Sequence, residues 1–168
     1  MALAAFLREC DIFSGLSDDQ LKKLIAISKE KTCAPGTLLY KIGDPSTHLN
    51  LVKEGKVFLQ MIADMGPANK PMLFTADVVT GGHAFGWSAF EEPNLHTMNA
   101  LIADPTTLIT FKGDKLKELM GQECEMGYEI MKGLSRLLAS RLDQARILLI
   151  SSRSEERRVG KECRLTCR

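Results

Sequence analysis

The spacing of apolar residues predicts helices at the two ends of the chain and short strands between them. Near the N-terminus, Leu21 and Leu24 lie on one face at helical spacing. Ser17 and Gln20 stand three residues apart at the start of this segment, so each side chain can satisfy the exposed backbone amide of the other. We therefore expect one or two helical turns over residues 2–8 and a second helix that begins after Ser17.

The middle of the chain alternates short apolar segments with turn signals. Pro35-Gly36 is typical of a type II turn, because proline presets one dihedral angle and glycine accepts the positive one. Glu54-Gly55 lies between two apolar segments and predicts a tight hairpin, and residues 65–71 form a polar loop tip. The expected strands are residues 37–41, 48–53, 56–62, 72–79, 99–103 and 107–111. Many short strands with glycine-marked turns favour a sandwich or barrel.

Helical spacing returns after Gly113. Asp114 is expected to cap a short helix that carries Leu116. Residues from about 123 to 150 then have room for one long helix with two apolar stripes. The first stripe contains Ile130, Leu134 and Leu137, and the second contains Met131, Leu138, Leu142, Ala145 and Leu149.

One stripe can cover the barrel, and the other needs a second partner. Its heptad-like spacing makes a parallel copy of the same helix the simplest partner, so we expect a homodimer. The alternative is a single wide apolar face packed on one domain.

The last sixteen residues, 153–168, have a composition of their own. They contain six basic and three acidic residues and little apolar pattern. The run RSEERRVGKEC closely resembles an in-frame translation of a common sequencing adapter, so we expect a non-native tail and a domain that spans residues 1–152. The alternative is a natural basic tail that contacts nucleic acid.

Charge and cysteine usage narrow the functional classes. Residues 1–152 hold 16 Lys and Arg against 18 Asp and Glu, a net charge of −2, which gives no global argument for nucleic-acid or membrane binding. Cys10, Cys33 and Cys124 lie far apart, as in neither a disulfide framework nor a metal knuckle. Because no apolar stretch is long enough for a signal peptide or a membrane span, we expect a soluble, cytoplasmic protein.

The order of these elements resembles the cyclic-nucleotide-binding domain superfamily. The matching stretches are FSGLSDDQLKKL at 13–24, APGTLLYKIGD at 34–44, LVKEGKVFL at 51–59 and GGHAFGWSAF at 81–90. Four glycines also fall where the family pattern places its turn glycines: Gly36, Gly43, Gly55 and Gly86. The resemblance covers roughly residues 5–150. It implies a mainly β fold with flanking helices, a double-stranded β-helix (jelly roll) followed by a long C-terminal helix.

The resemblance also implies a phosphate-binding cassette that begins at Gly86. In the family a short helix starts after a Phe-Gly step, and its free amides hold a phosphate. An acid next to the glycine binds the ribose, and an arginine across the loop neutralises the cyclic phosphate. Here the acid position holds Trp87, and the arginine position falls on Thr97, or on His96 if the loop is shifted by one residue. We therefore expect a degenerate cassette with weak or no binding of ordinary cyclic nucleotides.

Two outcomes for the cassette remain open at the level of sequence. Trp87 offers an indole face that suits a less charged or more aromatic effector, or it fills the pocket and leaves the domain without a ligand. The candidate ligand-binding residues are Gly86, Trp87, Ser88, Ala89, His96, Thr97, Met98 and Arg146. Of these, Arg146 lies on the long helix and would restore the missing positive charge.

These features predict a non-enzymatic regulatory sensor that signals through its long helix. A second hypothesis is the sensor half of a bacterial catabolite-activator-type transcription regulator, whose DNA-binding helix-turn-helix would follow residue 152. A third is a metalloenzyme on a cupin-like barrel. It is disfavoured because His48, His83 and His96 lack metal-ligand spacing, and no catalytic residues or metal ligands are expected.

Overall fold

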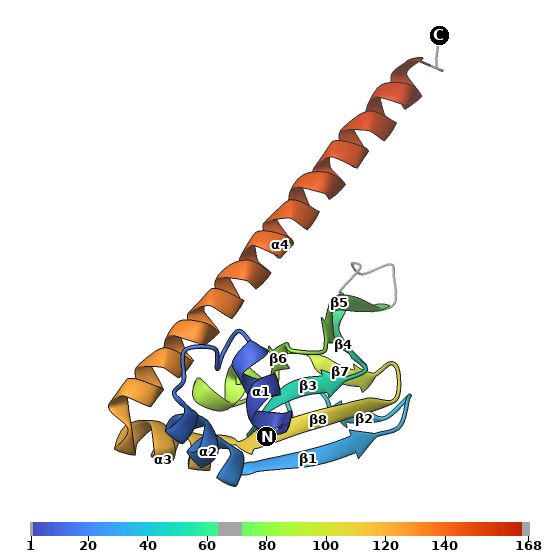
Figure 1. Cartoon of the computed structure of the whole chain (residues 1–168). Coiled ribbons are helices and arrows are strands. Elements are labelled where there is room, and N and C mark those ends of the chain that lie inside the picture. The colour runs from blue at the N-terminus through green and yellow to red at the C-terminus, as the bar shows by residue number, and fades with distance from the viewer. Residues whose placement is uncertain (1, 64–71, 166–168) are drawn as a thin grey trace.

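Eight strands, four α-helices and one short 3₁₀ helix make up residues 2–63 and 72–165, the part of the chain that the computed structural model describes (Figure 1). In chain order they are α1 (Ala2–Glu9), α2 (Asp18–Ala26), β1 (Ser28–Cys33), β2 (Leu38–Tyr40), β3 (His48–Glu54), β4 (Lys56–Ala63), β5 (Met72–Thr80), β6 (Ala84–Phe85), η1 (Trp87–Phe90), β7 (Asn99–Ile102), β8 (Thr106–Lys112), α3 (Gly113–Gln122) and α4 (Cys124–Leu165). The loop tip expected at 65–71 lies outside the described residues.

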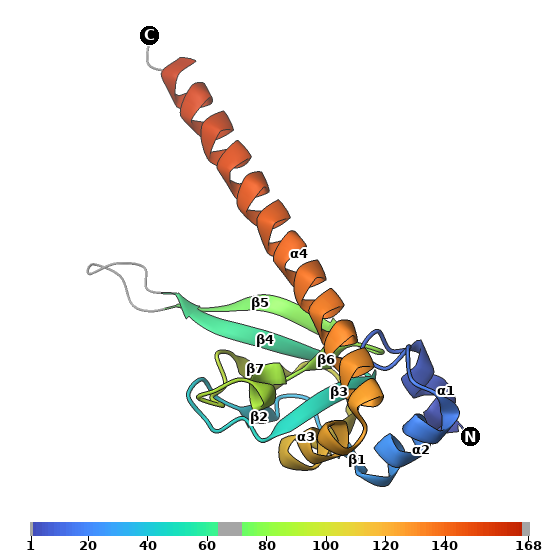
Figure 2. The same cartoon turned by 90° about the vertical axis from the view of Figure 1, so that its left-hand side faces the viewer.

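The strands form two antiparallel four-stranded sheets that face each other. One sheet has the order β1-β8-β3-β6 and the other the order β2-β7-β4-β5. The helices α1, α2 and α3 pack on the outer face of the first sheet, while α4 runs past β4 and β5 and away from the barrel (Figure 2). The structure confirms the expected jelly roll with a long C-terminal helix.

The prediction of a hairpin at Glu54-Gly55 is wrong. β3 pairs with β8 and β6, whereas β4 pairs with β5 and β7, so the turn crosses from one sheet to the other. Gly55 has a φ of 97°, and a Cβ there would lie 2.4 Å from the carbonyl oxygen of Pro105. The corner is held instead by Thr106, whose hydroxyl accepts the Lys56 amide at 3.1 Å. Glycine is required here by a close backbone approach, not by strand pairing.

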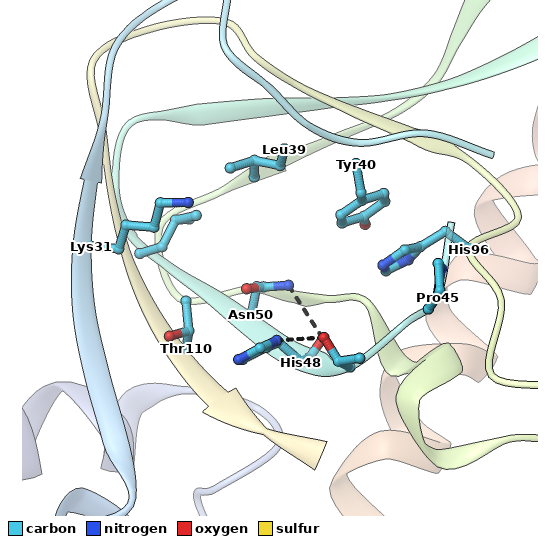
Figure 3. Close-up of a pocket in the computed structure, with 10 residues that line it drawn as sticks. Lys31, Leu39, Tyr40, Pro45, His48, Asn50, His96 and Thr110 are labelled. Atoms are coloured by element: carbon cyan, nitrogen blue, oxygen red, sulfur yellow. Dashed lines mark hydrogen bonds between the residues drawn. The ribbon is translucent and has the colours of Figure 1, made fainter. Parts of the chain in front are cut away.

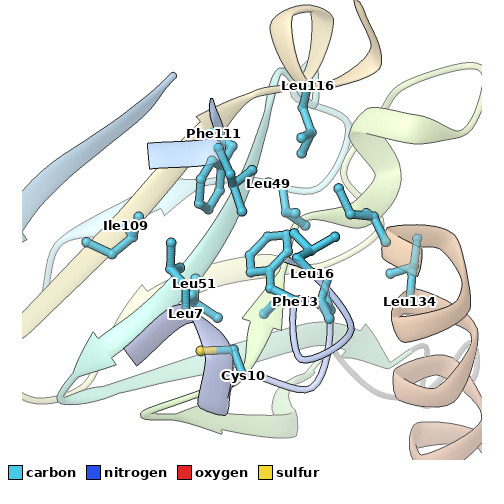
Figure 4. Packing of buried hydrophobic residues seen from close by; sticks show 14 of the residues in the cluster. Leu7, Cys10, Phe13, Leu16, Leu49, Leu51, Ile109, Phe111, Leu116 and Leu134 are labelled. Carbon is cyan, nitrogen blue, oxygen red and sulfur yellow. The ribbon is translucent and has the colours of Figure 1, made fainter. Parts of the chain in front are cut away.

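Two hydrophobic clusters lie on opposite faces of the first sheet. Leu49 and Leu51 point from β3 toward the helices, where they meet Phe13 and Leu134 (Figure 4). Val52, the next residue along β3, points between the two sheets and packs with Phe85. Because successive side chains of a strand alternate faces, a strand buried on both sides reads as a continuous apolar run.

The N-terminal helices follow the sequence expectation. The amide of Gln20 donates to Ser17 Oγ, and the amide of Ser17 donates to Gln20 Oε1 at 2.9 Å, which completes the capping box. Leu21 and Leu24 are fully buried in the helix-side cluster. The turn at Pro35-Gly36 also forms, with a φ of 79° at Gly36.

The start of α3 differs from the expectation. Its N-cap is Lys112, which makes no capping hydrogen bond with its side chain, and Asp114 lies inside the first turn. Packing explains why the helix starts earlier. A Cβ on Gly113 would lie only 3.2 Å from the Ala89 side chain, so a small residue lets the chain enter the helix against η1. Asp114 still stabilises the positive helix end by its charge.

The long helix α4 begins at Cys124 and ends at Leu165, beyond the expected end near residue 150. Residues 153–165 are rich in Arg, Glu and Lys and contain no proline, so nothing in their sequence stops a helix. The first apolar stripe is buried, with Ile130 at 1% exposure and Leu134 at 6%. Met131, Leu138 and Leu142 of the second stripe are exposed.

Two strands were missing from the sequence expectation. In β1 only the last of the six residues is buried, so its sequence SKEKTC carries no apolar alternation. In β6 only Ala84 and Phe85 pair with β3. Neither segment presents a periodic signal, and both are defined by their pairing with distant strands.

No described helix is long and apolar enough to cross a membrane.

Candidate functional site

Gly86 positions the short helix of the expected cassette. It follows β6 with a φ of 83° and serves as the N-cap of η1. A Cβ at this position would lie 2.8 Å from the carbonyl oxygen of His48 and 3.1 Å from Asn50 Nδ2. Both the backbone angle and the lack of space require glycine, so the Phe-Gly step turns the chain into η1 directly against β3.

The loop after η1 is tied back to the helix by Asn94. Its Nδ2 donates to the carbonyl oxygens of Ser88, Ala89 and Glu91, at 2.8 to 3.3 Å. Asn94 has a φ of 56°, a left-handed conformation that asparagine tolerates better than most residues. This fixed loop places the following residues, 96–98, over the start of η1.

His96 occupies the arginine position of the cassette in one of the two expected alignments. It is 7% exposed and stacks on Tyr40, with ring centroids 3.4 Å apart and planes within 4°. Burial lowers the pKa of His96, and Asp44 opposes this shift. The imidazole is therefore predominantly neutral at pH 7 and supplies no fixed positive charge.

Trp87 occupies the position at which the family resemblance places an acid. Its indole is half-buried and packs against both hydrophobic clusters of the domain. The side chain thus fills space at the junction of the two cores and at the same time walls two cavities.

The first cavity, which we call the cassette pocket, is small. It holds about 20 Å³, enough for little more than one water molecule. Six of the eight candidate residues line it: Gly86, Trp87, Ser88, His96, Thr97 and Met98. Tyr40 and Leu59 complete the lining. The structure therefore brings the cassette residues together, but the stacked rings and the indole leave no room for a phosphate.

The other two candidates lie elsewhere. Ala89 is buried and faces Gly113 at the start of α3, so its side chain is a packing element beneath η1. Arg146 pairs with Asp143 one turn away on α4 at 3.2 Å, with both side chains more than 60% exposed. Arg146 lines neither cavity and does not replace the missing arginine.

The second cavity, which we call the helix-side cavity, lies between the barrel and α4. It holds about 450 Å³. Its walls come from β4 and β5, from the cassette and from α4: Met61, Thr75, Ala76, Asp77, Val78, Trp87, Met98, Arg141, Gln144 and Ala145. Trp87 and Met98 belong to both cavities, so the cassette pocket adjoins the helix-side cavity through these two side chains.

One ion pair joins α4 to the barrel at this cavity. Arg141 Nη1 donates to Asp77 Oδ2 on β5, and the two side chains are only 18% and 22% exposed. Burial lowers the pKa of Arg141, although a guanidinium stays charged in proteins. Asp77 had given no signal in the sequence, because it lies 64 residues from its partner in an otherwise ordinary strand.

Comparison with solved structures identifies the fold family. A protein from Geobacter metallireducens named as a cyclic nucleotide-binding protein superposes with a TM-score of 0.69 at 26% identity, over 84% of this chain and 99% of that one. The N-terminal domain of a transcriptional regulator from Streptomyces coelicolor superposes with a TM-score of 0.64 at 25% identity, over 80% and 93%. The chain has the fold of the cyclic-nucleotide-binding domain superfamily.

More distant members of the superfamily share the fold. The catabolite activator protein of Thermus thermophilus superposes with a TM-score of 0.67 at 22% identity, over 83% of this chain and 61% of that one. No protein-family model and no curated protein matches the sequence. The relation to the superfamily thus rests on three-dimensional structure and on the ordered glycine landmarks.

Proposed function

We propose that the chain is a non-enzymatic regulatory sensor domain that binds a small, weakly charged effector in the helix-side cavity. The observation that carries this proposal is the composition of the cavity walls, which come from β5, Trp87 and α4. A molecule bound there contacts the barrel and the helix together. Binding of the effector can move α4 only if the effector makes different contacts when the helix is docked on the barrel and when it is not.

The cavity lining defines the chemical class of the effector. Of the described residues in the lining, only Asp77 and Arg141 are charged, and they neutralise each other. Trp87 contributes a flat aromatic face, and Met61 and Met98 contribute polarisable walls. The volume lies within the usual range for small-molecule sites. These features favour a neutral aromatic or apolar molecule over an anion.

An ordinary cyclic nucleotide fits this site poorly. At the cassette, Trp87 and Thr97 stand in the positions of the two ionic anchors, and His96 is predominantly neutral. Loss of one charge-assisted contact costs about 1.5–3 kcal/mol, or one to two powers of ten in affinity. Two such losses together place a cyclic nucleotide outside the micromolar range.

The proposal is tested with two ligands that differ chiefly in the phosphate. Trp87 is the only tryptophan of the chain, so its fluorescence reports on the helix-side cavity without labelling. We expect adenosine to perturb this fluorescence at lower concentration than cyclic AMP does. Ala145→Phe, which fills the cavity, abolishes the response, whereas Ala139→Phe on the same helix retains it. Tighter binding of cyclic AMP by tenfold or more contradicts the proposal.

We also propose that a second copy of the chain covers the exposed stripe of α4. Met131, Leu138 and Leu142 are 44%, 41% and 53% exposed and lie at heptad-like spacing. Sedimentation of the wild-type chain should show a dimer, and Leu138→Glu with Leu142→Glu should give a monomer. Ser140→Glu, on the opposite face of the helix, should remain dimeric. A monomeric wild-type chain contradicts dimerisation.

A second candidate function is the sensor half of a transcription regulator. Its support is the likeness to the Streptomyces coelicolor regulator domain and to the Thermus thermophilus catabolite activator protein. In this case α4 would transmit the signal to a DNA-binding domain in the cytoplasm. Determination of the genomic reading frame after Ser152 tests it: a helix-turn-helix segment supports this candidate, and an early stop codon removes it.

A further inference from the structure

A third cavity opens between the two sheets, on the other side of the Tyr40–His96 stack. It holds about 220 Å³ and lies among β1, β2, β3 and β8. Figure 3 shows polar side chains from these elements turned toward the same space. We call it the basic cavity and define it by Lys31, Tyr40, His48, Asn50, His96 and Thr110.

Positive charge gathers around this cavity, and Asp44 acts on it only from beside His96, outside the lining. A smaller cavity of about 90 Å³ shares His48 and Thr110 and adds Lys29, Lys112 and Lys115 to the lining. Among the residues that the structure describes, no aspartate or glutamate lines either cavity. Within residues 2–63 and 72–165, no carboxylate lies within ion-pair distance of Lys29, Lys31, Lys112 or Lys115.

The strand register explains how the charges come together. Lys29 and Lys31 are two residues apart on β1 and therefore point to the same face. Lys29 stands opposite Thr110, which stands opposite Asn50, and His48 stands opposite Lys112. Like charges on one face of a sheet destabilise it unless a counter-charge is near. The first sheet thus carries an unneutralised basic end on its inner face.

The same lysine charges act on His48. Partial burial lowers its pKa, and the charges of Lys112, Lys29 and Lys31 lower it further. Its Nδ1 lies 2.8 Å from Thr47 Oγ1, so the ring is held in place. Asn50, 8% exposed, donates one amide hydrogen to the His48 carbonyl oxygen at 3.3 Å and keeps a second hydrogen for a ligand.

We propose that the basic cavity binds a small phosphate-bearing ligand at a site separate from the cassette pocket and the helix-side cavity. Lys31 lines the cavity and supplies a charge to the ligand, and the Asn50 amide supplies a fixed donor. Lys29 and Lys112 line the neighbouring smaller cavity and add to the positive potential. The stacked rings of Tyr40 and His96 line both this cavity and the cassette pocket, so they form the wall between the two sites.

The proposal is tested by NMR titration of the full chain with pyrophosphate. The chain has three histidines, so the imidazole spectrum is simple. We expect saturable shifts of His48 and a rise of its pKa toward the ordinary value, because a bound anion offsets the lysine charges. His83, which lines none of the described cavities, should not respond. Sodium chloride at matched ionic strength should not reproduce the His48 shifts.

Two variants that each remove one positive charge complete the test. Lys31→Gln should weaken pyrophosphate binding about tenfold, as expected for loss of one charge-assisted contact. Lys117→Gln removes the same charge from α3, where the side chain lines a different cavity, and should bind as the wild type does. Equal binding by both variants, an unresponsive His48, or identical shifts with chloride would each overturn the proposal. None of these outcomes bears on the helix-side cavity.

Discussion

The ion pair between Arg141 and Asp77 should control how firmly α4 is docked on the barrel. Asp77→Asn keeps the shape of the side chain and removes its charge, which leaves Arg141 partly buried without a counter-ion. The wild-type pair is about four-fifths buried on both sides. A hydrogen bond to a charged group contributes about 1.5–3 kcal/mol, compared with about 0.2–1 kcal/mol for an exposed pair.

This difference predicts a measurable release of the helix. A loss of 1.5–3 kcal/mol shifts the docking equilibrium of α4 by roughly 10- to 150-fold. We therefore expect amide hydrogen exchange in the α4 segment around Arg141 to accelerate by about tenfold or more, while the buried segment around Ile130 stays protected. Trp87 emission should shift to longer wavelength, because the indole gains contact with water when the helix leaves.

A matched control lies five residues further along the same helix. Arg146→Gln breaks the exposed pair with Asp143 and should change hydrogen exchange by no more than about twofold. If Asp77→Asn behaves like Arg146→Gln, the ion pair does not hold the helix, and the coupling proposed between cavity and helix loses its physical basis.

Three further perturbations test the packing and the electrostatics of the domain. Gly133→Ala should lower the free energy of unfolding in urea by about 1–3 kcal/mol, because the new Cβ would lie 2.5 Å from the Ile12 carbonyl oxygen. Gly121→Ala is the control: a Cβ there would meet no atom within 4 Å, so this change should be neutral or stabilising. Ser17→Ala should cost about 1 kcal/mol through loss of the capping box, and an unchanged urea midpoint would contradict this. Burial lowers the pKa of His96 in the folded protein, so its stabilising contribution is present above the unfolded-state pKa of about 6.5 and is lost as the pH falls. The free energy of unfolding of His96→Gln should therefore change less between pH 7 and pH 5 than that of the wild type.

The sequence predicts those parts of the fold that local chemistry determines. Ser17 and Gln20 identify a helix start because both partners of the capping box lie within one turn. Gly36 identifies its turn because only the backbone angle matters there. Gly55 shows the limit of such signals. Its positive φ is local, but whether the flanking strands pair with each other depends on β8, which is about fifty residues away.

In the candidate site, too, local features could be predicted from the sequence and contacts between distant segments could not. The Phe-Gly step locates η1, and the family resemblance placed His96 and Thr97 beside it as the two possible positions of the family's arginine. Arg141 and Arg146 are indistinguishable by composition, yet they lie about 140° apart around the helix. Only the docked position of α4 determines that Arg141 meets the barrel. The Tyr40–His96 stack is likewise set by contact between segments that are distant in sequence.

We propose that the cassette keeps the shell of a cyclic-nucleotide site but has lost its ionic anchors. Calorimetric titration of the full chain with cyclic AMP and cyclic GMP tests this most directly. We expect no binding of either nucleotide in the micromolar range. A micromolar dissociation constant for either nucleotide that Lys31→Gln leaves unchanged would assign binding to the cassette and not to the basic cavity, and would contradict the claim.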